Sequence, residues 1–298
     1  MGRITKRYRV TKVRVPSAPA EGTLPLLRDG DDEVAVDVDT RADVVSVEEP
    51  LEIRVGGSPL TTTMRTPGND IELVHGFLYS EGLITKKTDI STIRYCAGAT
   101  GPDGRNTYNV VEVDFAPGVA LPDAAARRAF TTTSACGVCG TTSIAQLMGK
   151  AHCAITPFTI SVPTILSLPD ALRAGQESFA RTGGIHAAGL FTRSGEPLVI
   201  AEDVGRHNAA DKVIGWALVN ECLPLDDVVL ALSSRASFEL VQKAVMAGIG
   251  AMATVSAPSS LAIDTAREAG LILAGFVRPG RMNLYAGAER VLPGDLLR

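Results

Sequence analysis

Val228-Val-Leu-Ala-Leu232 is an apolar strand-like run, and the segments on either side of it decide the fold class. After this run the sequence predicts a helix at 238–247, a strand at 251–255, a helix at 260–269 and a strand at 271–276. Before it, the sequence predicts a helix at 167–181, two strands at 187–191 and 197–200, and a helix at 208–219. Ser167 is expected to cap the first helix. Asn208 is expected to open the second, with Asp211 three residues on as a variant of the capping box. This alternation indicates βαβ units with helices on both faces of a sheet.

The first third of the chain has a different hydrophobic pattern, in which apolar residues alternate with period two. A hairpin is predicted around Gly56-Gly57, a further strand at 111–115, and one helix that Asn69 or Asp70 caps and that ends at Gly82. Residues 1–14 carry six Lys or Arg and alternate as an edge strand does. We therefore expect an α+β domain at 1–130, a connecting segment at 131–154 and an α/β domain at 155–298.

Composition excludes several classes of protein. The chain has 298 residues and contains no run of eighteen apolar residues, so we expect no membrane span. An apolar signal region is absent after the basic N-terminus, and five cysteines without regular spacing fit a reducing cytoplasm. The formal net charge of −4 gives no general affinity for nucleic acid.

The pair Cys136 and Cys139 lies in a polar segment, 131–143, that also contains five threonines and two serines. A buried structural cysteine is expected in an apolar run, so this setting favours a thiol that a partner can reach. A helix is predicted to begin at Thr142 or Ser143, and its N-terminus lowers the pKa of a thiol toward which it points.

Four chemistries remain open for this cysteine pair. A zinc site is one, because His152 and Cys153 complete a C-x2-C-x12-H-C pattern, although adjacent ligands are awkward in a strand. A thioredoxin-like disulfide and two incidental loop thiols are the second and third. The fourth is a sulfur carrier, in which one thiolate accepts a sulfane sulfur as a persulfide.

Polar segments follow several predicted strands. They are Glu202–Asn208, Ser233–Arg235, Ser256–Ser260 and Phe276–Arg281. In open α/β sheets ligands bind at the carboxyl ends of strands, so we expect these segments to form one pocket for an anionic ligand. The chain has no G-x-x-x-x-G-K-[ST] segment, which argues against a nucleotide-hydrolysing site.

A series of motifs in order carries a family resemblance. They are Met64-Arg-Thr-Pro-Gly68 with the helix ending at Gly82, Cys136-Gly-Val-Cys-Gly140, Thr182-Gly-Gly-Ile-His186, Glu202-Asp-Val-Gly-Arg-His-Asn208 with Asp211-Lys212, Ser237-Phe-Glu239, and Ser256-Ala-Pro-Ser-Ser-Leu-Ala262. Together they resemble the formate dehydrogenase accessory sulfurtransferases, the FdhD/NarQ family, over roughly residues 45 to 287. One departure is Ser234, where the family pattern has glycine.

The resemblance implies a cytoplasmic homodimer that takes sulfur from a cysteine desulfurase and passes it to the molybdenum cofactor, in its bis-molybdopterin guanine dinucleotide form, for formate dehydrogenase. It implies that Cys136 bears the persulfide and that Cys139 relays or resolves it, with no metal of the protein's own. The implied cofactor-binding residues, which should also bind GDP-like fragments, are His207, Asn208, Ser259, Ser260, Phe276, Val277, Arg278, Pro279, Gly280 and Arg281. The rival interpretation is a zinc-stabilised interaction module that uses Cys136, Cys139 and His152 without sulfur chemistry.

The resemblance also implies a cytidine-deaminase-like fold for the C-terminal domain. Zinc deaminases need H-x-E and P-C-x-x-C, and neither pattern occurs here, since Ala135 precedes Cys136. We therefore expect the fold without the deamination reaction. Small residues at Ala244, Ala247 and Gly248 permit close helix packing, which we connect with the expected homodimer.

Overall fold

The computed structural model describes residues 4–14, 25–29, 32–35, 37–96, 100, 106–123 and 154–294. Its α-helices in these ranges are α1 (Asp70–Ser80), α4 (Val162–Ala174), α5 (Glu177–Thr182), α6 (Arg206–Val219), α7 (Phe238–Met246) and α8 (Ser260–Ala269), and its short 3-10 helices are η1 (Lys87–Asp89) and η2 (Ala288–Arg290). None of the helices in the described ranges is long and apolar enough to span a bilayer.

A six-stranded sheet organises the second half of the chain, with the order β11-β10-β12-β13-β14-β15. Its strands are β10 (His186–Thr192), β11 (Pro197–Asp203), β12 (Val228–Leu232), β13 (Ala251–Thr254), β14 (Ile272–Arg278) and β15 (Arg281–Ala286). Strands β12, β13 and β14 are parallel and are linked through α7 and α8. The predicted βαβ units are therefore confirmed, while β10, β11 and β15 pair antiparallel with their neighbours.

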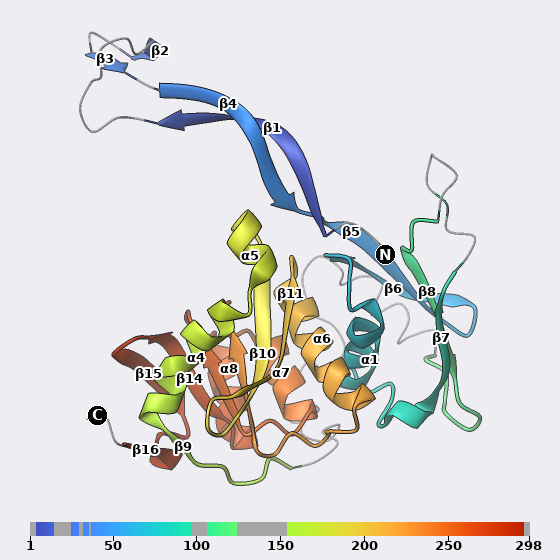
Figure 1. Ribbon diagram of the computed structural model, residues 1–298. Helices are drawn as coiled ribbons and strands as arrows, with labels where there is room; N and C mark the ends of the chain where they lie inside the picture. Colours follow the sequence, from blue (N-terminus) through green and yellow to red (C-terminus); the bar gives the residue numbers. More distant parts are fainter. Residues whose placement is uncertain are drawn as a thin grey trace.

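Helices cover both faces of this sheet, as Figure 1 shows for α4 on one side and α6, α7 and α8 on the other. Alternate residues of β12 supply the two faces, because Val229 packs with the α4 layer and Leu230 packs with the opposite layer. This alternation follows from the period-two geometry of a strand. The sequence prediction of a sheet buried on both faces is confirmed.

The first half forms a second sheet, of order β6-β5-β8-β7. Its strands are β5 (Glu49–Val55), β6 (Ser58–Arg65), β7 (Ile90–Tyr95) and β8 (Val110–Phe115), and the predicted hairpin through Gly56-Gly57 joins β5 to β6. Leu51 and Val111 of this sheet belong to the same apolar cluster as Leu230 and Leu273 of the larger sheet. The two halves thus share a core, and the division at 130 and 155 stays a prediction.

Helices α1 and α6 make the closest contact between the two halves. A Cβ atom on Gly76 of α1 would overlap the carbonyl oxygen of Asp211, and one on Gly215 of α6 would overlap that of Glu72. The two backbones therefore touch directly, which only glycine allows at these positions. Ala244 and Ala247, in contrast, are fully buried within the chain, so the small surface that we expected to serve a second copy is already covered.

The predicted helix at 167–181 is wrong in its start and in its continuity. Helix α4 begins at Val162, because Ser161 accepts a hydrogen bond from the Thr164 backbone N–H and a proline follows in the first turn. Gly175 ends α4, and α5 begins two residues later. Ser167 lies inside α4, where its hydroxyl donates to the Thr164 carbonyl.

The predicted side-chain caps at Asn69 and Asn208 are also wrong. Asn69 adopts a left-handed conformation at the start of α1 without a side-chain cap. Helix α6 begins at Arg206, and Asn208 uses its amide to donate to the Met64 carbonyl and to Asp203. Tertiary contacts therefore replace the local hydrogen bonds that the sequence favours.

The N-terminal segment forms the predicted edge strand, as part of a two-stranded ribbon. Among the described strands, β1 (Thr5–Arg14) pairs antiparallel only with β4 (Asp37–Ser46), and the ribbon extends away from the body in Figure 1. The remaining short strands are β2 (Pro25–Asp29), β3 (Asp32–Ala35), β9 (Ile160–Ser161) and β16 (Val291–Leu292).

Strand β15 was not predicted from the sequence. It pairs antiparallel with β14, so the two strands form a hairpin.

Candidate functional site

The polar segments that follow the strands lie side by side along one edge of the large sheet. The Phe276 backbone N–H donates to the Ser256 carbonyl at 3.2 Å, and the Ser259 N–H donates to the Ala236 carbonyl at 2.9 Å. Ser237 Oγ lies 3.3 Å from His207 Nε2, which joins the start of α7 to the start of α6. The predicted convergence of these segments is present. We call this region the carboxyl edge, with the four segments 202–208, 233–237, 256–260 and 276–281.

The antiparallel strand β10 begins at the same edge and adds His186 to it. The Ala187 backbone N–H donates to Ser233 Oγ at 2.9 Å, so the start of β10 lies beside the end of β12. His186 pairs in register with Asp203, the last residue of β11. Burial lowers the pKa of His186, and the nearby Arg206 lowers it further.

Asp203 and Asn208 hold the start of α6 in place. Asp203 is fully buried, accepts hydrogen bonds from the Thr66 and Gly205 backbone N–H groups, and pairs with Lys212 Nζ at 2.7 Å. Asn208 is 7% exposed and bridges Asp203 to β6. Its side-chain amide is engaged inside the protein, so its part in cofactor binding stays a prediction that the geometry does not favour.

A second buried pair lies behind this one. Lys243 Nζ lies 2.8 Å from Asp211 Oδ1, and Ser80 donates a hydrogen bond to the same carboxylate. Burial alone lowers the pKa of Lys243, but Asp211 and Glu81 raise it above its usual value. The ammonium group therefore stays charged, and its positive charge acts on His207.

His207 also lies at the carboxyl edge, where its Nε2 atom approaches Ser237 at the start of α7. Burial, followed by the charges of Lys243 and Arg206 and by His186, lowers the pKa of His207 to about 3. The ring is therefore neutral near pH 7. Its Nε2 atom lies 4.0 Å from Glu239 Oε2, but the two groups do not form a charged pair. A neutral imidazole beside a serine hydroxyl can accept or donate a hydrogen bond to a ligand.

Arg206 supplies an unsatisfied donor at this edge. Its Nε atom is buried and has no hydrogen-bond partner within the described ranges. A buried donor without a partner costs about 1–3 kcal/mol, and an anionic ligand would satisfy it with a charge-assisted hydrogen bond. Arg235, Arg278 and Arg281 are exposed along the same edge, so the carboxyl edge is cationic.

The segment 276–281 is the turn of the β14–β15 hairpin. Arg278 and Arg281 pair across it in register, and Gly280 has a φ of 80°, which a tight turn requires. Phe276 has a φ of 51° and is 37% exposed, whereas the Val277 side chain is fully buried in the core. The two arginines and Phe276 are thus available to a ligand, and Val277 offers only its backbone.

The two serines of the cofactor prediction start α8. Ser259 accepts a hydrogen bond from the Ala262 backbone N–H and so caps the helix, and Ser260 is exposed. The other predicted residues, Cys136, Cys139 and His152, lie outside the described residues. The persulfide and the zinc site therefore both stay predictions.

Sequence reasoning omitted Arg206, Ser237 and Glu239 from the site residues, although all three lie in the motifs quoted above. The available signal was their position at the start of a helix that follows a strand. The burial of Arg206 Nε depends on the packing of α6 against neighbouring elements, which no local pattern shows.

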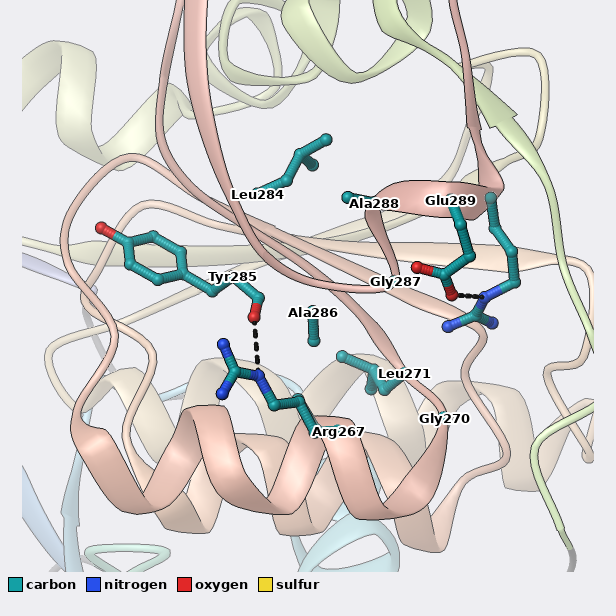
Figure 2. Close-up of a pocket in the computed structure, with 11 residues that line it drawn as sticks. Arg267, Gly270, Leu271, Leu284, Tyr285, Ala286, Gly287, Ala288 and Glu289 are labelled. Carbon is teal, nitrogen blue, oxygen red and sulfur yellow. Dashed lines mark hydrogen bonds and ion pairs between the residues drawn. The ribbon is translucent and has the colours of Figure 1, made fainter.

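A separate pocket of about 470 Å³ lies at the other end of α8, where Figure 2 shows its lining. The lining residues are Ala266, Arg267, Gly270, Leu271, Leu284, Tyr285, Ala286, Gly287, Ala288, Glu289 and Arg290. Arg267 Nε donates to the Tyr285 carbonyl at 3.1 Å, and Arg290 pairs with Glu289. The pocket contains none of the predicted site residues, and its arginines have partners within the chain.

Comparison with known proteins gives a consistent result. The FdhD/NarQ family model matches residues 46–292. The "Sulfur carrier protein FdhD" of Corynebacterium efficiens is 56% identical over 290 residues, which are 96% of this chain and 99% of that protein. The protein of the same name from Streptomyces coelicolor is 52% identical over 98% of this chain and 97% of its own length.

A solved structure resembles the fold. The crystal structure described as a formate dehydrogenase accessory protein from Desulfotalea psychrophila superposes with a TM-score of 0.69. It covers 97% of this chain and 100% of its own, at 21% sequence identity, so this likeness concerns the fold. Because the family model covers most of the chain and relatives above 50% identity align over nearly its full length, the chain belongs to the FdhD/NarQ family.

Proposed function

We propose that this protein is a sulfur carrier, as the names of its relatives indicate for them, and that it acts in the maturation of formate dehydrogenase. In this proposal Cys136 accepts sulfur from a cysteine desulfurase and the protein passes it to the molybdenum cofactor, in its bis-molybdopterin guanine dinucleotide form. The cofactor is here the substrate of the carrier and not a resident group.

The observation that carries the proposal is the cationic carboxyl edge. The cofactor is a large anion because of its phosphates, and the edge presents exposed Arg278 and Arg281 beside the start of α8. The unpartnered Nε of Arg206 fits an anionic group at the same edge. Helix N-termini and guanidinium groups bind phosphates without hydrolysing them, which agrees with the lack of a phosphate-loop lysine.

The sulfur step follows the chemistry of thiol–disulfide exchange. The Cys136 thiolate attacks the terminal sulfur of the persulfide on the desulfurase, so a new S–S bond forms on Cys136. The S–S bond of the donor breaks, and its cysteine leaves as a thiolate. Cys139 would relay or resolve the persulfide, because its thiol is three residues away.

Further parts of the proposal rest on the resemblance and on composition. We propose a cytoplasmic location, a homodimer, and a cytidine-deaminase-like topology for the second half, whose mixed sheet with helices on both faces is compatible with it. The neutral His207 beside Ser237 is available for a hydrogen bond to the cargo. No deamination is proposed, since the required zinc motifs are missing.

The test is transfer of labelled sulfur. A cysteine desulfurase supplied with ³⁵S-cysteine should label the protein, and Cys136→Ala should abolish this labelling while Cys139→Ala retains a measurable fraction. Cys222→Ala is the matched control, because Cys222 is an exposed free cysteine, and it should label as the unmodified protein does. Equal labelling of the Cys136 and Cys139 variants would contradict the assignment.

The alternative function is a zinc-stabilised interaction module. Metal analysis of purified protein separates it from the carrier. Stoichiometric zinc that is lost on replacing Cys136, Cys139 and His152, together with no sulfur labelling, would favour the module. Labelling of zinc-free protein would exclude it.

A further inference from the structure

The β1–β4 ribbon has an unusual structure for an element that stands apart from the core. Ten residues of β1 pair with ten of β4 in unbroken register, from Thr5 opposite Ser46 to Arg14 opposite Asp37. Figure 1 shows it extending beyond α5 and away from both large sheets. A two-stranded ribbon alone is only marginally stable in water, so an additional surface is expected to pack on it.

Exposed apolar side chains on the ribbon also indicate that another surface packs on it. Five of the twelve large apolar side chains exposed in the described ranges belong to this ribbon and the residue before it, namely Ile4, Tyr8, Val13, Val38 and Val45. Val13 and Val38 lie opposite each other on one face of the ribbon, whereas Tyr8 and Val45 lie on the other face, so the charges, and not the apolar side chains, distinguish the two faces.

The two faces of the ribbon differ in charge. Because opposite residues share a face in an antiparallel pair, one face holds Thr5, Arg7, Arg9, Thr11 and Val13 with Ser46, Val44, Ala42, Thr40 and Val38. We call it the basic face: Arg7 lies opposite Val44 and Arg9 opposite Ala42, and the face carries no carboxylate. The other face carries Asp39 and Asp43, which lie near cations of the same face, at 3.8 Å from Arg41 and 3.6 Å from Lys12.

The basic face is anchored beside the carboxyl edge. At its root, Ser46 Oγ lies 2.8 Å from Thr182 Oγ1, and Arg181 donates to Thr5 Oγ1 at 3.4 Å, so this face is turned toward α5. Thr66 connects the root to the edge, since its hydroxyl donates to the Val47 carbonyl and its backbone N–H donates to Asp203. A partner on the basic face would therefore lie next to the carboxyl edge.

We propose that the basic face of the β1–β4 ribbon docks an acidic surface of the sulfur-donating protein. The inference rests on the proposed carrier function. The enzyme that receives the finished cofactor must engage the carboxyl edge itself, whereas a donor on the ribbon leaves that edge free for the cargo. The family match begins at residue 46, the last residue of β4, so nearly all of the ribbon lies before it.

The experiment compares two charge-reversal variants of the full chain. Arg7→Glu with Arg9→Glu changes the basic face, and Lys6→Glu with Arg14→Glu applies the same change in charge to the opposite face. The probe is the cysteine desulfurase of the same organism, with binding measured by calorimetry and sulfur transfer by ³⁵S labelling. Circular dichroism and thermal melting check that both variants fold.

The basic-face variant should bind the desulfurase about tenfold more weakly or worse, since opposed like charges are strongly unfavourable. It should still accept sulfur from glutathione persulfide, a small donor that needs no docking. The opposite-face variant should bind and transfer as the unmodified protein does. The affinity of the unmodified protein should fall as salt rises.

Desulfurase binding that is equal in the basic-face variant and the unmodified protein would overturn the proposal. Equal losses of desulfurase affinity in both variants would also overturn it. A change in sedimentation of the basic-face variant without a change in desulfurase binding would overturn it too, and would assign the face to contact between copies of this chain. If the unmodified protein accepts sulfur from neither the desulfurase nor the persulfide, the carrier function itself fails, which is a separate result.

Discussion

Two sets of charged residues occupy neighbouring regions of this protein and behave in opposite ways. Beneath the carboxyl edge, Asp203 pairs with Lys212 and Asp211 with Lys243, all four of them buried. At the edge, Arg278 and Arg281 are exposed on a hairpin turn. A charged side chain that has a partner inside the chain therefore serves the structure, whereas an exposed one is available to a ligand.

The largest effect should come from breaking a buried pair. Lys212→Met leaves the fully buried Asp203 carboxylate without its cation, and removing one partner of a buried pair destabilises by about 3–5 kcal/mol. Urea denaturation measures the free energy of unfolding. Arg94→Met, which breaks the exposed pair with Asp114, is the control and should leave the free energy of unfolding nearly unchanged. Similar losses in the two variants would remove the distinction between the regions.

The exposed arginines should affect ligand binding and leave stability nearly unchanged. We expect GDP to bind the carboxyl edge more tightly than ADP and not to be hydrolysed. Replacing Arg278 or Arg281 by alanine removes a charge-assisted contact worth about 1.5–3 kcal/mol, which is about ten- to a hundred-fold in affinity.

Calorimetric titration checks this second prediction. Arg193→Ala is the matched control, because Arg193 is a half-exposed arginine on the turn after β10, at the opposite edge of the sheet. It should bind GDP as the unmodified protein does. Undetectable GDP binding, or unchanged binding in the double variant of Arg278 and Arg281, would place the cofactor elsewhere and leave the cysteine assignment intact.

The smallest effect should appear in the pH dependence of stability, where His207 lies between the two regions. Its pKa is about 3 in the folded protein and about 6.5 when unfolded, so the unfolded chain binds more protons between these values. The free energy of unfolding should therefore fall as the pH is lowered below about 6.5.

His207→Gln should remove part of this fall. Because the side chain is 30% exposed, solvent reduces the effect, and we expect a difference of about 1–2 kcal/mol between pH 7 and pH 4. Unfolding by urea at several pH values, with and without the substitution, gives the difference directly. Identical pH profiles would show that the imidazole takes up its proton freely in the folded state.

Sequence patterns predicted the elements whose signals are local. The strands β12, β13 and β14 and the helices α7 and α8 were found from apolar runs and their spacing, and the hairpin between β5 and β6 from its glycines. The meeting of their loops at one edge followed from parallel topology alone. These features depend on periodicity, which short stretches of sequence contain.

What the sequence did not predict depends on partners far along the chain. Asn208 looks like a helix cap, but Met64, 144 residues away, takes its hydrogen bond. Strand β15 was not predicted, because it pairs with β14 and its own residues carry no clear strand pattern. The same reason hides the unpaired Nε of Arg206 and the two-stranded ribbon.

The contact between Gly76 and Gly215 has a consequence for synthesis on the ribosome. The apolar face of α1, with Leu73, Val74 and Leu78, is fully covered only when α6 has been made and has emerged. A growing chain therefore displays this face during the synthesis of well over a hundred further residues. Exposed apolar surface of this kind favours aggregation, so the nascent protein is a natural client for chaperones that bind near the exit tunnel.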